Sequence, residues 1–154
     1  MRVLITMLGP SVWAVANAFW SSIRDHGYLP ECVYLLCTDK GGNCAVAMQM
    51  IAATLEEYDV EPDVRAVEVD EESVLEVRDR VAAILDEESK HGNTVALDVT
   101  PGRKGTALGA MLAGGKRYEH IFYLYISSLD NANRPYLMVP AIRQRPHDLK
   151  KEAF

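Results

Sequence analysis

Two adjacent cations, Arg103 and Lys104, are the residues whose types and position most clearly suggest chemistry. They follow a turn at Pro101 and Gly102 that ends an apolar stretch at 95–99, and a run of small residues typical of a helix comes next. The first N–H groups of a helix lack backbone partners, and the helix dipole is positive there. Backbone and side chains together therefore predict an anion site that favours phosphate, with ordinary surface cations as the alternative.

Hydroxyl groups accompany these cations and extend the set of candidates. Thr100 precedes the turn and Thr106 follows it, while Asp98 ends the apolar stretch. Asp98 and Thr100 either satisfy loop N–H groups or take part in the chemistry. Near the N-terminus, Ser11 opens another helical pattern, where it can cap the helix, contact a ligand, or do both.

Composition restricts the classes of function. The chain has 154 residues, 49% of them hydrophobic, which predicts a single domain over 1–154 with a short basic tail from about residue 143. Lys and Arg total 16 against 22 acidic residues, a net charge of −6 that argues against DNA binding. Without a membrane-spanning run or a secretion signal, we expect a cytoplasmic protein. Three cysteines without zinc-site spacing predict neither a disulfide nor a structural metal.

Apolar strand patterns alternate with helical patterns along the chain. Strands are expected at 2–8, 32–37, 64–69, 95–99, 121–127 and 136–142, and helices at 11–26, 43–58, 71–89 and 105–114. Near-continuous apolar strands separated by helices predict an α/β, Rossmann-like fold, with a mainly parallel six-stranded sheet and helices on both faces.

Ligands of such sheets bind beyond the carboxyl ends of the strands. The loops at 8–11, 38–43 and 100–104 follow the first, second and fourth strands and therefore compete for that place. The first and fourth strands are expected to be neighbours, which would bring Ser11 close to Lys104.

Two common phosphate-binding motifs are missing. Gly9 has no companion glycines at the offsets of the dinucleotide fingerprint, and Gly105 separates Lys104 from Thr106 where a Walker-type loop needs them adjacent. We therefore expect no NAD, FAD or ATP hydrolysis, and no other cofactor.

The motif Leu-Gly-Pro-Ser at 8–11, followed by Leu-Asp-Val-Thr-Pro-Gly-Arg-Lys at 97–104 and a small-residue helix, resembles the CRISPR-associated Rossmann-fold (CARF) domain. The strand and helix plan of that family covers nearly the whole chain. Family members typically carry an appended effector domain, and neither such a domain nor the arginine-x4-histidine signature of a HEPN ribonuclease is evident here.

The resemblance implies that a cyclic oligoadenylate, the second messenger of type III CRISPR systems, binds in a pocket shared by two subunits. A stand-alone domain would then resemble the ring nucleases, which cleave cyclic tetra-adenylate without metal through in-line attack of a ribose 2′-hydroxyl. In that role Lys104 would stabilise the reacting phosphate, Arg103 would hold a neighbouring phosphate, and Ser11 would contact a phosphate or the 2′-hydroxyl. A non-catalytic sensor acting through a partner protein, or a protein for a different phosphorylated ligand, are the alternatives.

The full set of ligand contacts expected on this basis comes from all three loops. Trp13 either packs in the core or at the dimer interface, or stacks on adenine, and Lys40 is the weaker cationic candidate. The basic residues between 134 and 151 either cover the pocket or hydrate the surface. The expected contacts are Gly9, Pro10, Ser11, Trp13, Thr38, Lys40, Thr100, Pro101, Gly102, Arg103, Lys104 and Thr106.

Overall fold

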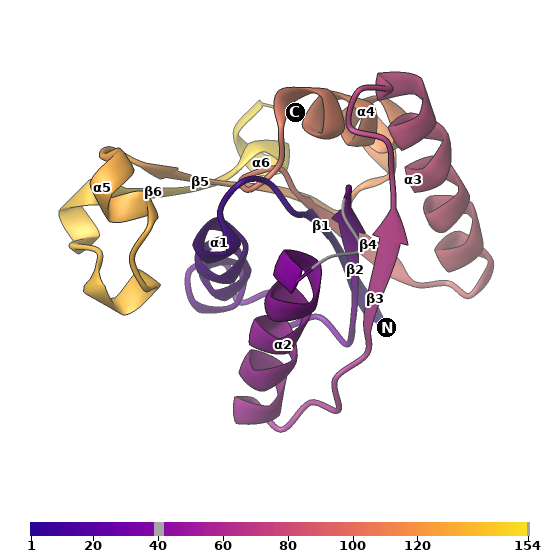
Figure 1. Ribbon diagram of the computed structural model, residues 1–154. Helices are drawn as coiled ribbons and strands as arrows, with labels where there is room; N and C mark the ends of the chain where they lie inside the picture. The colour runs from indigo at the N-terminus through magenta and orange to yellow at the C-terminus, as the bar shows by residue number, and fades with distance from the viewer. Residues whose placement is uncertain (39–41, 154) are drawn as a thin grey trace.

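The structure, a computed structural model, describes residues 1–38 and 42–153. Its centre is a six-stranded sheet in the order β3-β2-β1-β4-β5-β6 (Figure 1). The first five strands in this order, β3, β2, β1, β4 and β5, run parallel to one another, and β6 runs antiparallel to β5. The predicted α/β, Rossmann-like fold is confirmed. The strands are β1 (Arg2–Met7), β2 (Cys32–Cys37), β3 (Val64–Glu68), β4 (Thr94–Asp98), β5 (His120–Ile126) and β6 (Gln144–Asp148).

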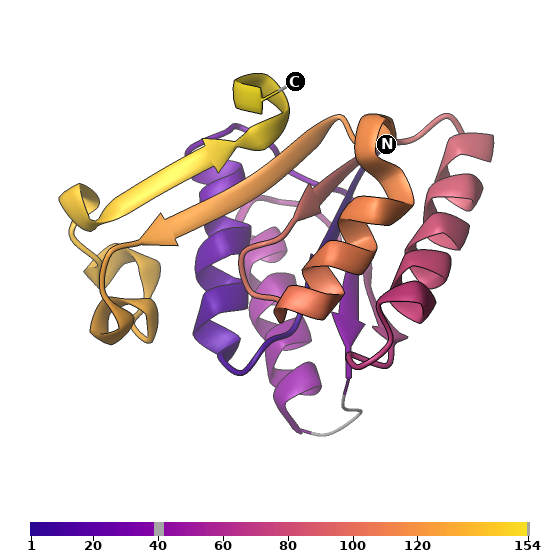
Figure 2. The same cartoon turned by 90° about the horizontal axis from the view of Figure 1, so that it is seen from above.

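Helices cover both faces of the sheet because successive strand side chains point to opposite sides. On β1, Val3 and Ile5 pack in the cluster that includes residues of α3 and α4, whereas Leu4 packs with residues of α1 and α2. Figure 2 shows the two helix pairs on opposite sides of the strands. The helices are α1 (Val12–Arg24), α2 (Gly42–Glu57), α3 (Val74–Lys90), α4 (Lys104–Gly114), α5 (Leu129–Ala132) and α6 (Leu149–Ala153).

The prediction of a sixth strand at 136–142 is wrong. Pro135 and Pro140 each precede a 3-10 turn, at Tyr136–Met138 and Ala141–Arg143. Proline lacks an N–H and restricts φ, so this segment cannot supply a regular ladder of donors. With α5 it forms an excursion, residues 127–143, that projects from the far end of β5 and β6 (Figures 1 and 2).

The sixth strand instead lies where a basic tail was predicted. β6 pairs with β5 alone, and its sequence Gln-Arg-Pro-His-Asp has no apolar pattern. An edge strand tolerates Pro146 because the missing N–H can face away from the ladder. The residues from 144 to 153 thus form an edge strand followed by α6.

The prediction that no disulfide forms is also wrong, because Cys37 is bonded to Cys44. Cys37 ends β2 and Cys44 lies in the first turn of α2, so the strand-to-helix connection brings their Cα atoms to 6.2 Å, a spacing that suits a disulfide. Cys32 is a buried free thiol. Among the described residues, no helix combines the length and the apolar character needed to cross a bilayer.

Candidate functional site

The loops after β1 and β4 lie against each other, as predicted, because these strands are parallel neighbours with Ile5 opposite Leu97. The contact is close at two glycines. A Cβ on Gly9 would overlap the carbonyl oxygen of Pro101, and a Cβ on Gly102 would overlap the Met7 side chain. The glycines of both motifs thus bring the two loops together at the carboxyl edge of the sheet.

Asp98 and Thr100 hold the β4–α4 turn from inside the protein. The buried Asp98 carboxylate accepts hydrogen bonds from the Thr6 hydroxyl at 2.9 Å and from the Thr100 backbone N–H at 3.0 Å. The Thr100 hydroxyl accepts the Leu124 N–H of β5 at 2.9 Å. Burial raises the pKa of Asp98 to about 6, and the bonds from Thr100 and Thr6 oppose that rise. Both side chains therefore satisfy backbone N–H groups, Asp98 that of Thr100 in the turn and Thr100 that of Leu124 in β5.

The two cations differ in their ion pairing within the protein. Arg103 precedes α4, and its Nε lies 2.8 Å from Oε2 of Glu71, in the segment that leads into α3. Lys104 is the exposed first residue of α4, and its ammonium has no ion pair or hydrogen bond with another residue in the described part of the chain. Lys104 is thus available to bind an anion. Arg103 can bind one only if its guanidinium separates from the Glu71 carboxylate or contacts both groups.

The other predicted contacts of this loop and helix lie around these cations. Thr106, like Pro101, is buried, so its hydroxyl belongs to the packed side of α4 rather than to its surface. The second strand's loop begins at the exposed Thr38, directly after Cys37. Lys40 lies outside the described residues.

Ser11 caps α1, which is one of the roles predicted for it. Its Oγ accepts the Ala14 N–H at 3.4 Å and donates to Oδ1 of Asn133 at 3.0 Å. Pro10, before it, is exposed. Trp13, the second residue of the helix, is 38% exposed and can meet a ligand base or a second subunit. Asn133 was not predicted, because nothing in its local sequence distinguishes it from other turn residues of the excursion.

A row of contacts fastens the excursion to α1. Asn17, only 2% exposed, donates its Nδ2 to the Arg134 carbonyl at 2.8 Å. The ring centroids of Trp20 and Tyr136 are 5.6 Å apart, and the Tyr136 hydroxyl donates a hydrogen bond to the Asp25 carboxylate at the end of the helix. Because the excursion begins at the carboxyl end of β5, these contacts place it beside the loop that holds Ser11.

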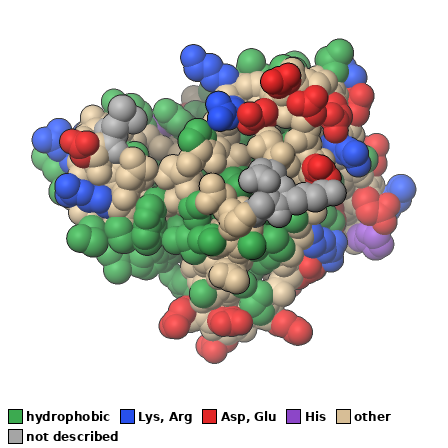
Figure 3. All heavy atoms as spheres, viewed as in Figure 1, with side chains coloured by type: hydrophobic (Ala, Val, Ile, Leu, Met, Phe, Trp, Pro, Cys, Tyr) green, Lys and Arg blue, Asp and Glu red, His purple; other side chains and the backbone are tan. Residues whose placement is uncertain are grey.

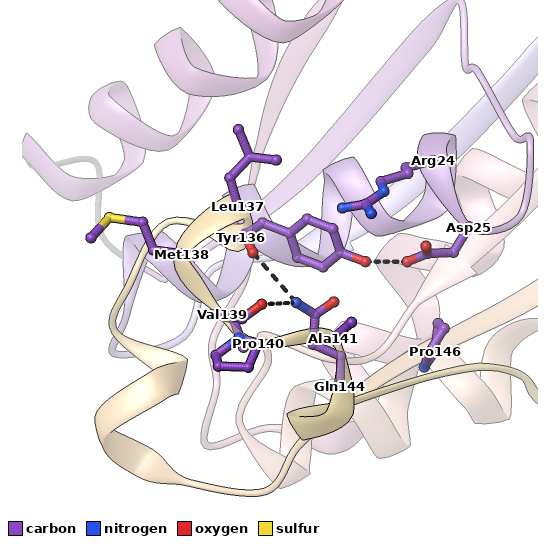
Figure 4. Close-up of a pocket in the computed structure, with 10 residues that line it drawn as sticks. All are labelled: Arg24, Asp25, Tyr136, Leu137, Met138, Val139, Pro140, Ala141, Gln144 and Pro146. Atoms are coloured by element: carbon purple, nitrogen blue, oxygen red, sulfur yellow. Dashed lines mark hydrogen bonds between the residues drawn. The ribbon is translucent and has the colours of Figure 1, made fainter.

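A pocket of about 430 Å3 lies where the end of α1 meets the excursion (Figure 4). The Arg24 guanidinium sits over the Tyr136 ring at 5.4 Å, and Gln144 donates its Nε2 to the Val139 carbonyl at 2.7 Å. None of the predicted ligand contacts lines this pocket, so it is separate from the β1 and β4 loops.

Charge is distributed unevenly over the molecule. Acidic side chains gather along α3 and at the end of α2, where Glu56, Glu57 and Asp59 are exposed (Figure 3). Within residues 1–38 and 42–153, no group of three or more His, Cys, Asp or Glu side chains is placed to hold a metal ion.

Several solved structures share the fold of this chain. The chain aligns with Can2 from Sulfobacillus thermosulfidooxidans in complex with cyclic tetra-adenylate at a TM-score of 0.59 and 19% identity, over 85% of this chain and 33% of that one. It aligns with Enterococcus italicus Csm6 bound to cyclic hexa-2′-fluoro-hexa-dAMP at a TM-score of 0.61 and 13% identity, over 99% of this chain and 42% of that one. A type III CRISPR defence DNA nuclease activated by cyclic oligoadenylate aligns at a TM-score of 0.56 and 22% identity, over 81% of this chain and 19% of that one.

These alignments confirm the predicted fold, that of the CARF domain which the two motifs resemble. The chain spans less than half of the length of each of these three proteins. No protein-family model matches the sequence, and no curated protein matches it.

Proposed function

We propose that this chain binds a cyclic oligoadenylate, with cyclic tetra-adenylate as the first candidate. The observation that carries the proposal is the Lys104 ammonium at the first residue of α4, which is exposed and has no ion pair or hydrogen bond among the described residues. It lies beside the glycine-packed loop that leads to Ser11. Unpaired N–H groups, the dipole of an eleven-residue helix and a cation favour a phosphate there. The ligands of Can2 and Csm6, which share the fold, support a ring of nucleotides as the source of that phosphate.

The proposed site is shared by two copies of the chain. A ring of identical nucleotides can carry a two-fold axis, and so does a homodimer with one self-complementary interface. Two copies of the loop pair would then contact equivalent phosphates, which doubles a short cationic motif in a chain of net charge −6. We expect light scattering to give the mass of a dimer at micromolar concentration, whereas a monomer with and without the ring would contradict a shared pocket.

We further propose that the bound ring is cleaved without a metal ion, which would switch off type III CRISPR signalling. The ribose 2′-oxygen attacks the adjacent phosphorus and loses its proton to solvent, while the bond to the 5′-oxygen breaks and that oxygen gains a proton. The products are a 2′,3′-cyclic phosphate and a 5′-hydroxyl. Lys104 would stabilise charge on the equatorial phosphate oxygens, and the loop contacts would hold the in-line geometry.

Incubation of the protein with cyclic tri-, tetra- and hexa-adenylate in EDTA tests binding and cleavage together. Chromatography with mass detection separates intact rings from linear products, and a protein-free incubation is the control. Linear adenylates that end in 2′,3′-cyclic phosphate support the nuclease. Turnover that requires an added divalent cation would contradict the metal-free mechanism.

A non-catalytic sensor is the second candidate, and one feature of the structure favours it. The excursion exposes Leu137, Met138 and Ile142 by 71%, 64% and 77%, and it is fastened to the helix that Ser11 caps. A ligand at Ser11 could therefore alter an apolar surface that meets a separate effector protein. Intact rings that elute with the protein would support the sensor, and no association with any ring would indicate a different phosphorylated ligand.

A further inference from the structure

The hydrogen-bonding capacity of Ser11 is nearly used within the protein. A serine hydroxyl has one proton to donate and two lone pairs that accept. The Ser11 proton goes to Oδ1 of Asn133 at 3.0 Å, and one lone pair receives the Ala14 N–H at 3.4 Å. One acceptor position is left for a ligand, and no donor position.

Asn133 holds its place because the excursion around it is anchored. The next residue, Arg134, receives a hydrogen bond on its carbonyl from the buried Asn17 at 2.8 Å. Loss of that bond would leave the buried amide of Asn17 without its acceptor, which is unfavourable. The Trp20 and Tyr136 rings fasten the following turn to the same helix. Asn133 is therefore presented to Ser11 by a fixed backbone, across 122 positions of sequence.

We propose that Asn133 is a positioning residue that makes Ser11 an acceptor toward the ligand. The inference rests on the proposed function and decides which group of the ring Ser11 meets. Phosphate oxygens accept hydrogen bonds and find no donor at Ser11, whereas a ribose 2′-hydroxyl can donate to the free lone pair. Ser11 thus receives a hydrogen bond from the 2′-hydroxyl and orients its oxygen toward phosphorus. The phosphate is left to Lys104 and the helix N–H groups.

The test compares binding of cyclic tetra-adenylate with binding of its all-2′-deoxy analogue, which cannot make this bond. Affinities are taken from rapid-mixing titrations completed before product forms. We expect wild type to prefer the ribose ring by about tenfold, the size of one to two hydrogen bonds. Ser11→Ala should abolish the preference, and Asn133→Ala should reduce it to about twofold because the Ser11 proton is then free to turn. Asn133→Asp keeps an acceptor oxygen and should restore it.

Controls separate a positioning role from a merely structural one. Asn131→Ala, a substitution at another asparagine of the same turn, should leave the preference unchanged. Combining Ser11→Ala with Asn133→Ala should have no more effect than Ser11→Ala alone. In urea unfolding without ligand, the effects of these two substitutions on the transition midpoint should also be less than additive.

The outcomes distinguish this inference from the proposed function. A full ribose preference in Asn133→Ala, or its loss in Asn133→Asp, overturns the positioning role while ring binding stands. Additive effects of the two alanine substitutions on unfolding overturn the Ser11–Asn133 bond, whichever ligand binds. Failure of wild type to bind any adenylate ring overturns the proposed function and, with it, the assignment of the 2′-hydroxyl.

Discussion

Replacing Asp98 with asparagine should change how the stability of the protein depends on pH. Burial raises the pKa of this carboxyl from 3.8 to about 6, against the opposing hydrogen bonds of Thr100 and Thr6. Below the unfolded pKa the carboxyl is neutral in both states and imposes no penalty. Above the folded pKa it is charged in both states, and burial of that charge lowers the free energy of unfolding.

The magnitude follows from the shift. A rise from 3.8 to about 6 is about 2 pKa units, or about 3 kcal/mol. The folded state retains the Asp98 proton more strongly than the unfolded state, so the stability contributed by this group is fully present below about pH 4. It is lost as the pH rises through about 6. The side chain of Asp98→Asn does not titrate and escapes this loss.

Urea unfolding followed by circular dichroism, at several values between about pH 4 and about pH 7, measures the effect. We expect the free energy of unfolding of wild type, minus that of Asp98→Asn, to fall by about 3 kcal/mol over this range. The difference cancels the titration of all other groups. Asp130→Asn, which removes an exposed carboxyl from α5, is the matched control. A difference for Asp98→Asn that stays flat or rises with pH would refute the reasoning.

Three further outcomes are expected. Lys104→Ala should lower single-turnover ring cleavage by about 10²–10³-fold, as for loss of an oxyanion donor, whereas Lys116→Ala, an exposed lysine just beyond the other end of α4, should match wild type. Equal rates in both variants would move the site elsewhere. Glu71→Gln removes the carboxylate paired with the neighbouring arginine and should strengthen ring binding by up to about fivefold in equilibrium titration; weaker binding would show that this pair orients the arginine for the ligand. Alkylation of the unfolded, unreduced protein should label one thiol, and reduction should release Cys37 and Cys44 as two more; three labels before reduction would contradict the disulfide.

The loop pair at the centre of the site was predictable because its signals are local. An apolar strand, a proline-glycine turn and a small-residue stretch mark 95–114, and an apolar stretch at 2–8 followed by Gly9 marks its partner. Parallel α/β sheets place such loops together at one edge, so adjacency followed from the fold class. The structure adds that the adjacency is a contact, since a Cβ on Gly9 would overlap the carbonyl oxygen of Pro101.

The edge of the sheet was not predictable in the same way. The apolar residues at 136–142 are typical of a strand, yet they lie on 3-10 turns where several of them are exposed. The true strand, β6, is polar and contains Pro146, because an edge strand needs one partner rather than two buried faces. Sequence patterns identify strands by their buried apolar residues. They fail at this edge because its apolar residues are exposed and its strand is polar.

By itself, the sequence determined the α/β class, the first five strands, the four long helices and the two motif loops, since each depends on periodicity or turn residues within a short window. Only the tertiary structure decided that Cys37 reaches Cys44, that Thr100 bonds to β5 and that Ser11 donates its proton to Asn133. Each of these depends on how separate elements pack against one another. The direction of one hydroxyl proton in the candidate site is therefore a property of the folded chain.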